Sequence, residues 1–143
     1  MAKSPLDYFP GTWHVKRTIT DALSDDDGTF EGIATFTRRD EHLDFEEVGV
    51  MQLGAYRGRA RRRLYYRQAS ESSIDVSFLD GHHFVSIDLS SGTSRDVHLC
   101  ERDRYDITTV VHSHDRFDER WRVSGPSKDY EALTLFERLA ETS

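Results

Sequence analysis

The stretch DYFPGTWHVKRTITD, residues 7–21, alternates apolar and polar side chains after a Pro-Gly pair. Alternate residues of a strand point to the same face, so Trp13, Val15 and Arg17 share one side, which their apolar members mark as buried. A buried arginine costs several kcal/mol unless a carboxylate pairs with it. We expect Glu47 to be that partner, because it occupies the apolar face of its own alternating segment.

The rest of the chain repeats this pattern, with short turns about every eight to twelve residues, which is typical of all-β proteins. Ser4 and Pro5 fit the start of a short helical turn within residues 1–10. The predicted fold class is all-β: one up-and-down lipocalin-like barrel of about ten antiparallel strands, forming a single domain over residues 1–143. The expected strands are 12–20, 29–38, 42–51, 57–68, 72–79, 82–90, 95–100, 105–112, 116–124 and 130–139.

Composition limits the partners. The net charge of −7 argues against nucleic acid as a main partner. The exception is RGRARRR, residues 57–63, whose arginines we expect to split between the two faces of a strand, as a solvated or internally paired strand or as an anion-binding patch. We expect no membrane association, because no segment reaches the roughly 20 apolar residues of a membrane span. Cys100 is the only cysteine, which favours a reducing, cytoplasmic location.

Two turns predict which side chains face inward. An Asp80-Gly81 two-residue hairpin would pair Val76 with Val85 and Phe78 with His83, which places His83 inside. A four-residue turn at 101–104 would set Cys100 opposite Tyr105 and His98 opposite Ile107.

A turn at 112–116 would set Thr109 opposite Glu119, Ile107 opposite Trp121 and Tyr105 opposite Val123. Together these registers put His98, Cys100, Tyr105 and Trp121 on one inner face. A slip of one residue in either turn would move His98 and Cys100 outside.

Gly11-Thr12-Trp13 resembles the Gly-x-Trp signature that begins the first strand of the calycins, the lipocalin-like barrels. In that family a basic residue of the last strand stacks over the tryptophan, and Arg138 stands at the matching position. The resemblance implies that Arg138 packs on Trp13 and closes one end of the barrel.

The chain is also similar to an uncharacterised family of short bacterial lipocalin-like proteins, which supports the fold and implies no activity. The residues that carry this likeness are Phe9, Gly11, Trp13, Arg17, Asp80, Gly81, His98, Cys100, Asp103, Tyr105 and the run from Trp121 to Tyr130.

The main functional hypothesis is a pocket for a small, partly hydrophobic or aromatic, acidic molecule, because a guanidinium inside a barrel suits a carboxylate. Small inward residues such as Gly32 and Gly49 favour an open interior. No cofactor or metal is expected, and outward Leu133, Leu135 and Leu139 suggest a possible homodimer. The candidate ligand-binding residues are Arg17, Glu47, Tyr66, His83, Cys100, Trp121 and Lys128, although the phase of the strand that carries Tyr66 is not settled by its sequence.

Alternatives use the same interior. His98 as general base, with Tyr105 or Lys128 as proton donor, would suit a cofactor-independent isomerase, dehydratase or cyclase. Haem binding through His83 or His98, a metal site that joins both histidines to a carboxylate, and a filled barrel without a pocket are further hypotheses.

Overall fold

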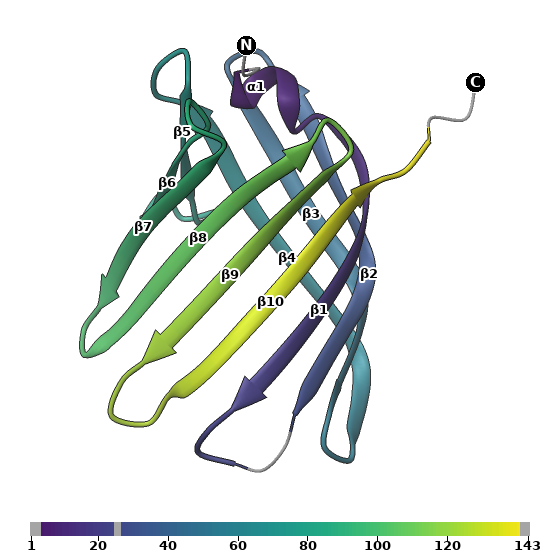
Figure 1. The fold of residues 1–143 in the computed structure, drawn as a ribbon, viewed down its shortest axis with the longest axis vertical. Helices are drawn as coiled ribbons and strands as arrows, with labels where there is room; N and C mark the ends of the chain where they lie inside the picture. The colour runs from purple at the N-terminus through teal and green to yellow at the C-terminus, as the bar shows by residue number, and fades with distance from the viewer. Residues whose placement is uncertain (1–3, 25–26, 141–143) are drawn as a thin grey trace.

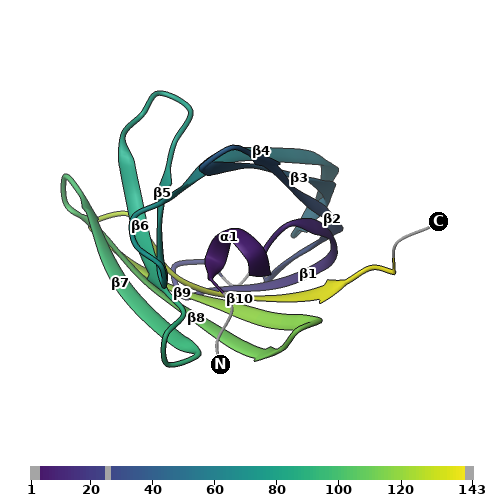
Figure 2. The same cartoon turned by 90° about the horizontal axis from the view of Figure 1, so that it is seen from above.

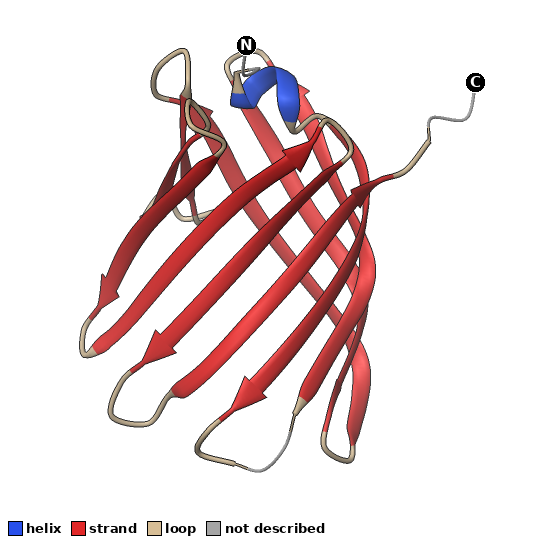
Figure 3. Cartoon of the chain, in the orientation of Figure 1, coloured by secondary structure: helices blue, strands red, loops and turns tan. Residues whose placement is uncertain are grey.

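The computed structural model describes residues 4–24 and 27–140, which form ten antiparallel strands and one short helix (Figures 1 and 3). This confirms the predicted all-β barrel. The elements are α1 (Pro5–Tyr8), β1 (Gly11–Asp21), β2 (Gly28–Arg39), β3 (His42–Leu53), β4 (Tyr56–Gln68), β5 (Ser73–Ser77), β6 (His83–Asp88), β7 (Thr93–Cys100), β8 (Asp103–Ser113), β9 (Arg116–Ser124) and β10 (Asp129–Arg138). No helix in the described residues is long and apolar enough to cross a membrane.

The strands form one sheet in the order β6-β5-β4-β3-β2-β1-β10-β9-β8-β7, which curls into a nearly closed barrel (Figure 2). The remaining seam lies between β6 and β7, where side chains replace the backbone ladder. The backbone N–H of Ser86 donates to Asp96 at 2.7 Å, and that of Asp88 donates to Ser94 at 2.9 Å. Aspartate and serine thus satisfy edge groups that a further strand would otherwise bind.

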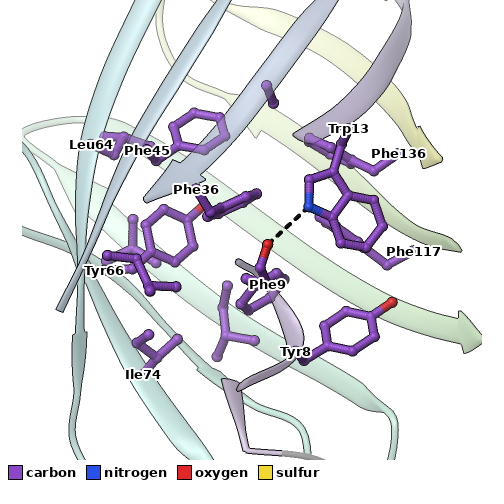
Figure 4. Packing of buried hydrophobic residues seen from close by; sticks show 14 of the residues in the cluster. Tyr8, Phe9, Trp13, Phe36, Phe45, Leu64, Tyr66, Ile74, Phe117 and Phe136 are labelled. Carbon is purple, nitrogen blue, oxygen red and sulfur yellow. Dashed lines mark hydrogen bonds between the residues drawn. The ribbon is translucent and has the colours of Figure 1, made fainter. Parts of the chain in front are cut away.

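Helix α1 covers one end of the barrel, above a packed aromatic cluster (Figures 2 and 4). Trp13 is fully buried there, and its indole N–H donates to the carbonyl of Phe9 at 2.9 Å. Arg138 lies opposite Trp13 in the β1–β10 register, with its guanidinium carbon 4.1 Å from a Trp13 ring centroid. The same guanidinium donates to the carbonyls of Tyr8 and Pro10. The predicted stacking of Arg138 on Trp13 is therefore confirmed.

The β5–β6 hairpin differs from its predicted register near the turn. Its loop holds three residues, 79–81, with Gly81 at φ +91°, and the N–H of Phe78 bonds to His82. A bulge beside Val76 then restores the predicted pairing of Val76 with Val85. The bulge rotates the intervening residues, so Phe84 is buried and His83 is exposed. The inward placement of His83 was wrong.

The β7–β8 turn is also shorter than expected. Cys100 pairs with Asp103 around a two-residue turn in which Glu101 has φ +57°, so His98 lies opposite Tyr105 instead of Ile107. Cys100 sits at the tip of this hairpin and is exposed, which corrects its predicted place on the inner face. The β8–β9 pairs that align Thr109 with Glu119, Ile107 with Trp121 and Tyr105 with Val123 are confirmed.

The small size of Gly32 and Gly49 suggested space for a ligand, but the structure leaves none beside them. They pair directly, and a Cβ on Gly32 would lie 2.2 Å from the carbonyl oxygen of Val48. A Cβ on Gly49 would lie 2.3 Å from that of Glu31. These glycines allow the backbones of β2 and β3 to approach closely where the strands bend.

Candidate functional site

The interior of the barrel has two unlike halves. Beneath α1 the packing is dense, and a void of about 10 Å³, the size of one water molecule, lies among Leu64, Tyr66, Val76, Phe84 and Ile107. Toward the other end, where no described helix lies across the strands, inward side chains become half-buried. They include Arg17, Ile19, Tyr105, Trp121 and Tyr130. Any ligand inside the barrel must therefore lie in this second half.

Arg17 and Glu47 form the floor of the open half. The guanidinium donates to both carboxylate oxygens, at 3.0 and 2.7 Å, and its Nε donates to Thr134 at 2.8 Å. The ring of Phe30 lies beneath it, 4.9 Å from the guanidinium carbon. The predicted partnership of Arg17 with Glu47 is confirmed, and it uses three of the five N–H donors that an arginine carries.

Arg62 is a second inward guanidinium, and it was not among the predicted site residues. It lies between the rings of Phe45 and Trp121, at 5.4 and 5.5 Å, and 3.5 Å from Glu47. Its Nε is buried without a hydrogen-bond partner among the described residues. Burial is the largest influence and lowers the pKa of Arg62, but the charge on Glu47, aided by Glu119, raises it above its usual value, so the group stays charged.

The strand pattern contained a signal for Arg62. In R-G-R-A-R the small residues Gly58 and Ala60 stand at even positions, in phase with Leu64 and Tyr66. The even face is the inner one, so Arg62 points inward while the odd-numbered arginines point outward. The expected split of the run therefore holds only in part, because four of its five arginines share the outer face.

A second polar group lies at the rim of the open end. The ammonium of Lys128 donates to the hydroxyl of Tyr105 at 2.8 Å and lies 3.0 Å from Asp103. The hydrogen bond with Tyr105, followed by that with Asp103, raises the pKa of Lys128. The His98 ring is 6.0 Å from that of Tyr105. Three of the predicted residues, His98, Tyr105 and Lys128, are thus brought together.

Other predicted site residues lie elsewhere. Tyr66 belongs to the aromatic cluster, stacked edge-on against Phe36 at 5.2 Å, and burial raises its pKa. Trp121 is half-buried, and its indole N–H donates to Glu119 at 2.5 Å. His83 and Cys100 lie on the surface, so His83 cannot join His98 in the proposed metal site or face a haem in the lumen. No group of three metal-ligating side chains forms within residues 4–24 and 27–140.

The outer wall carries a shallow depression of about 540 Å³, across β1, β10, β9, β8 and β7. Arg120 lies in it beside Thr108 and Leu133 of the neighbouring strands, with no ion pair among the described residues. This depression offers an alternative place for a small anion, separate from the lumen.

Among curated proteins, none matches this chain. Solved structures of similar fold share little of the sequence, so they establish the architecture alone. The S-type phycobiliprotein lyase CPES from Guillardia theta has a TM-score of 0.67 at 8% identity, over 96% of this chain and 92% of the lyase. A redesigned β-barrel, mFAP0, bound to DFHBI, has a TM-score of 0.52 at 14% identity, over 92% and 99%.

A fluorescence-activating β-barrel of de novo design has a TM-score of 0.51 at 18% identity, over 94% of this chain and 96% of the design. These likenesses support a lipocalin-like barrel. At the level of sequence, residues 9–138 match one family over nearly the whole barrel. The chain belongs to DUF6314, a family of unknown function.

Proposed function

We propose that this protein binds a small, partly aromatic, acidic molecule in the open half of its barrel. The observation that carries the proposal is the arrangement around Glu47, where one buried carboxylate faces the two guanidinium groups of Arg17 and Arg62. The charge of the buried Glu119 also acts on Arg62, so two carboxylates balance the two guanidinium groups. The Nε of Arg62 still has no hydrogen-bond partner among the described residues, and a carboxylate or a similar anion would accept a charge-assisted hydrogen bond from this arginine.

Arg62 is the better anchor of the two. Its contact with Glu47 is long, and its Nε donor is unused among the described residues, whereas Arg17 already holds Glu47 and Thr134. Trp121 lies over the same guanidinium and is half-buried, so its ring offers an apolar surface to the body of the ligand. His98, Tyr105 and Lys128 would contact the end of the ligand that points out of the barrel.

The similar structures support the proposal that a barrel of this kind binds a small molecule in its interior. The redesigned barrel mFAP0 is bound to DFHBI, and another similar barrel is a phycobiliprotein lyase. In this chain the aromatic cluster fills the end beneath α1, so the ligand would be smaller than one that spans the whole lumen. We further propose a cytoplasmic location, and a homodimer through Leu133 and Leu139, which are each about two-fifths exposed.

The test is a fluorescence titration with 8-anilinonaphthalene-1-sulfonate, an aromatic anion, on the wild type and two matched variants. Arg62→Met removes one of the two inner guanidinium groups, and Arg120→Met removes one of the three in the outer depression, which Arg95 and Arg122 also line. We expect Arg62→Met to weaken binding at least about tenfold, since a charged hydrogen bond is lost, and Arg120→Met to leave it unchanged. The proposal would be contradicted if the dye did not bind the wild type, or if Arg120→Met weakened its binding and Arg62→Met did not.

A cofactor-independent enzyme is the second candidate, favoured by the hydrogen bond between Lys128 and Tyr105. That bond holds the phenol in place opposite His98 and leaves its own proton available for a ligand. An isomerase, dehydratase or cyclase needs no more than such an acid–base pair. Once a ligand is known, Tyr105→Phe and His98→Ala should abolish turnover even at ligand concentrations that saturate the variants; turnover that survives both changes would exclude this role.

A further inference from the structure

Strand β4 is much longer than its neighbour β5, and much of its outer edge is unpaired. Only residues 65–68 of β4 pair with β5, although β4 begins at Tyr56. Residues 56–64, which we call the free edge of β4, pair with β3 on one side and with no described strand on the other. Figure 1 shows β5 confined to the end of the barrel near α1, whereas β4 continues to the opposite end.

The place beside the free edge is where a longer β5 would lie. β5 runs antiparallel to β4 and points toward its Tyr56 end, but the bulge at Val76 and the following turn send the chain back as β6. The peptide groups along 56–64 therefore alternate between bonding to β3 and facing outward, as in any edge strand. These outward N–H and C=O groups can pair with another extended chain.

A row of positive charge lies along the same residues. Arg57, Arg59, Arg61 and Arg63 all project from the outer face, at the spacing of about 6.6–6.8 Å that separates alternate residues of a strand. Glu46 pairs with Arg61 and approaches Arg63 at 3.7 Å. No ion pair among the described residues involves Arg57 or Arg59, which lie opposite Gln52 and Val50 of β3.

We propose that the free edge of β4 is a docking site for an acidic, extended segment of a partner protein, which adds to the sheet as a strand antiparallel to β4. Backbone hydrogen bonds would join the segment to residues 56–64, in continuation of β5. Aspartate or glutamate at every second position would then lie directly opposite the arginines, as favourable cross-strand pairs.

The charge of the row selects among extended chains. A second copy of β4 would bring like charges face to face, and an uncharged strand would leave Arg57 and Arg59 without a counter-charge, so both are disfavoured. A single-stranded nucleic acid would satisfy the charge but not the peptide groups. An acidic strand satisfies both the charge and the backbone.

The test uses synthetic peptides with the full chain. The probe is a ten-residue peptide of alternating threonine and glutamate; the controls are the same peptide with alternate backbone nitrogens methylated, a threonine–lysine peptide and a ten-nucleotide oligothymidylate. Binding is followed by fluorescence anisotropy, and amide exchange is measured along β4. We expect only the unmodified acidic peptide to bind and to slow exchange within residues 56–64.

Two charge-reversal variants complete the test. Arg57→Glu with Arg59→Glu breaks no ion pair of the described chain and should weaken binding of the acidic peptide at least about tenfold. Arg67→Glu is the matched control, because Arg67 lies on the same face but already pairs with Asp75 of β5 in the strand register. Equal binding of the methylated peptide, preference for the oligothymidylate, no loss in the double variant, or no binding by the wild type would each overturn the proposal.

Discussion

Arg17 and Glu47 meet across strand β2, with the guanidinium of one donating to both oxygens of the other and the ring of Phe30 packed beneath. Glu47 is only 2% exposed, so its partners take the place of the water that would otherwise surround its carboxylate. Arg62 also lies 3.5 Å from Glu47, so this carboxylate faces two cations. Removal of Glu47 therefore affects both arginines, whereas removal of Arg17 leaves Glu47 with one partner.

Glu47→Gln should therefore destabilise the barrel more than Arg17→Met. The first change leaves Arg17 without its counter-charge and Arg62 with that of Glu119 alone, at a cost of about 3–5 kcal/mol, the range found when one partner of a buried pair is removed. The second leaves Glu47 paired with Arg62 and should cost less. Urea denaturation of both variants measures the order, and a larger loss for Arg17→Met would show that Arg62 does not stabilise Glu47.

Trp13→Ala should lower the free energy of unfolding by about 3–5 kcal/mol, since it empties a fully buried ring position. It also removes the hydrogen bond to Phe9 and the surface on which Arg138 stacks. Thermal unfolding followed by circular dichroism measures the effect. Trp121→Ala is the control, because Trp121 is half-buried, and a greater loss in that variant would contradict the structural role given to Trp13.

His98→Ala should change stability by less than about 1 kcal/mol, since His98 is half-buried and makes only ring contacts among the described residues. Its effect should fall on binding of the aromatic anion instead. His83→Ala, on the exposed side of β6, should alter neither property. Parallel denaturation and dye titrations of the two variants test this, and a similar loss of dye binding in both would remove His98 from the site.

The sequence predicted the features that depend on alternation alone. The inward phase of Trp13 and Arg17 and the pairing of Arg17 with Glu47 follow from the two-residue period of a strand. The β8–β9 register also needed the assumed turn at 112–116, where the structure has a shorter turn and a bulge that give the same pairs. His83 was misplaced because its position depends on a bulge, where one added residue rotates the next side chain by half a turn. Cys100 was misplaced because the β7–β8 turn is shorter than expected, which leaves it exposed at the tip of the hairpin although it keeps the phase of His98. Arg62 was missed because arginine occupies both faces of its strand.

Gly32→Ala tests the close approach of β2 and β3. The new methyl group would meet the carbonyl of Val48 at 2.2 Å and the Cα of Gly49 at 2.6 Å, both of them backbone atoms that cannot rotate away. We expect a loss of at least about 1–3 kcal/mol, as for other overpacked sites. Gly28→Ala on the same strand is the control, because its methyl group would meet the movable end of Leu53 at 3.0 Å. Equal stability of the two variants would show that the strands can separate without cost.

Tyr8 should make the barrel sensitive to alkaline pH. Burial, opposed by the nearby charge of Arg138, raises the pKa of Tyr8 to about 12, and its hydroxyl donates to the carbonyl of Ser113 at 2.7 Å. The folded state thus favours the neutral phenol, whereas the unfolded chain ionises near pH 10. The resulting stabilisation is complete below about pH 10 and is lost as the pH rises toward about 12, by up to about 2–3 kcal/mol.

Tyr8→Phe isolates this contribution. At pH 8 the variant should be less stable than the wild type by about 1 kcal/mol, the worth of a typical hydrogen bond. Above pH 10 the difference should narrow and then reverse, because only the wild type still has a phenol at position 8 whose ionisation favours unfolding. Urea denaturation between pH 8 and pH 11.5 measures both curves. The control is Tyr56→Phe, because Tyr56 is exposed, and its free energy of unfolding should differ from that of the wild type by the same amount at every pH. A constant difference for Tyr8→Phe as well would show that the Tyr8 phenol ionises alike in the folded and unfolded states.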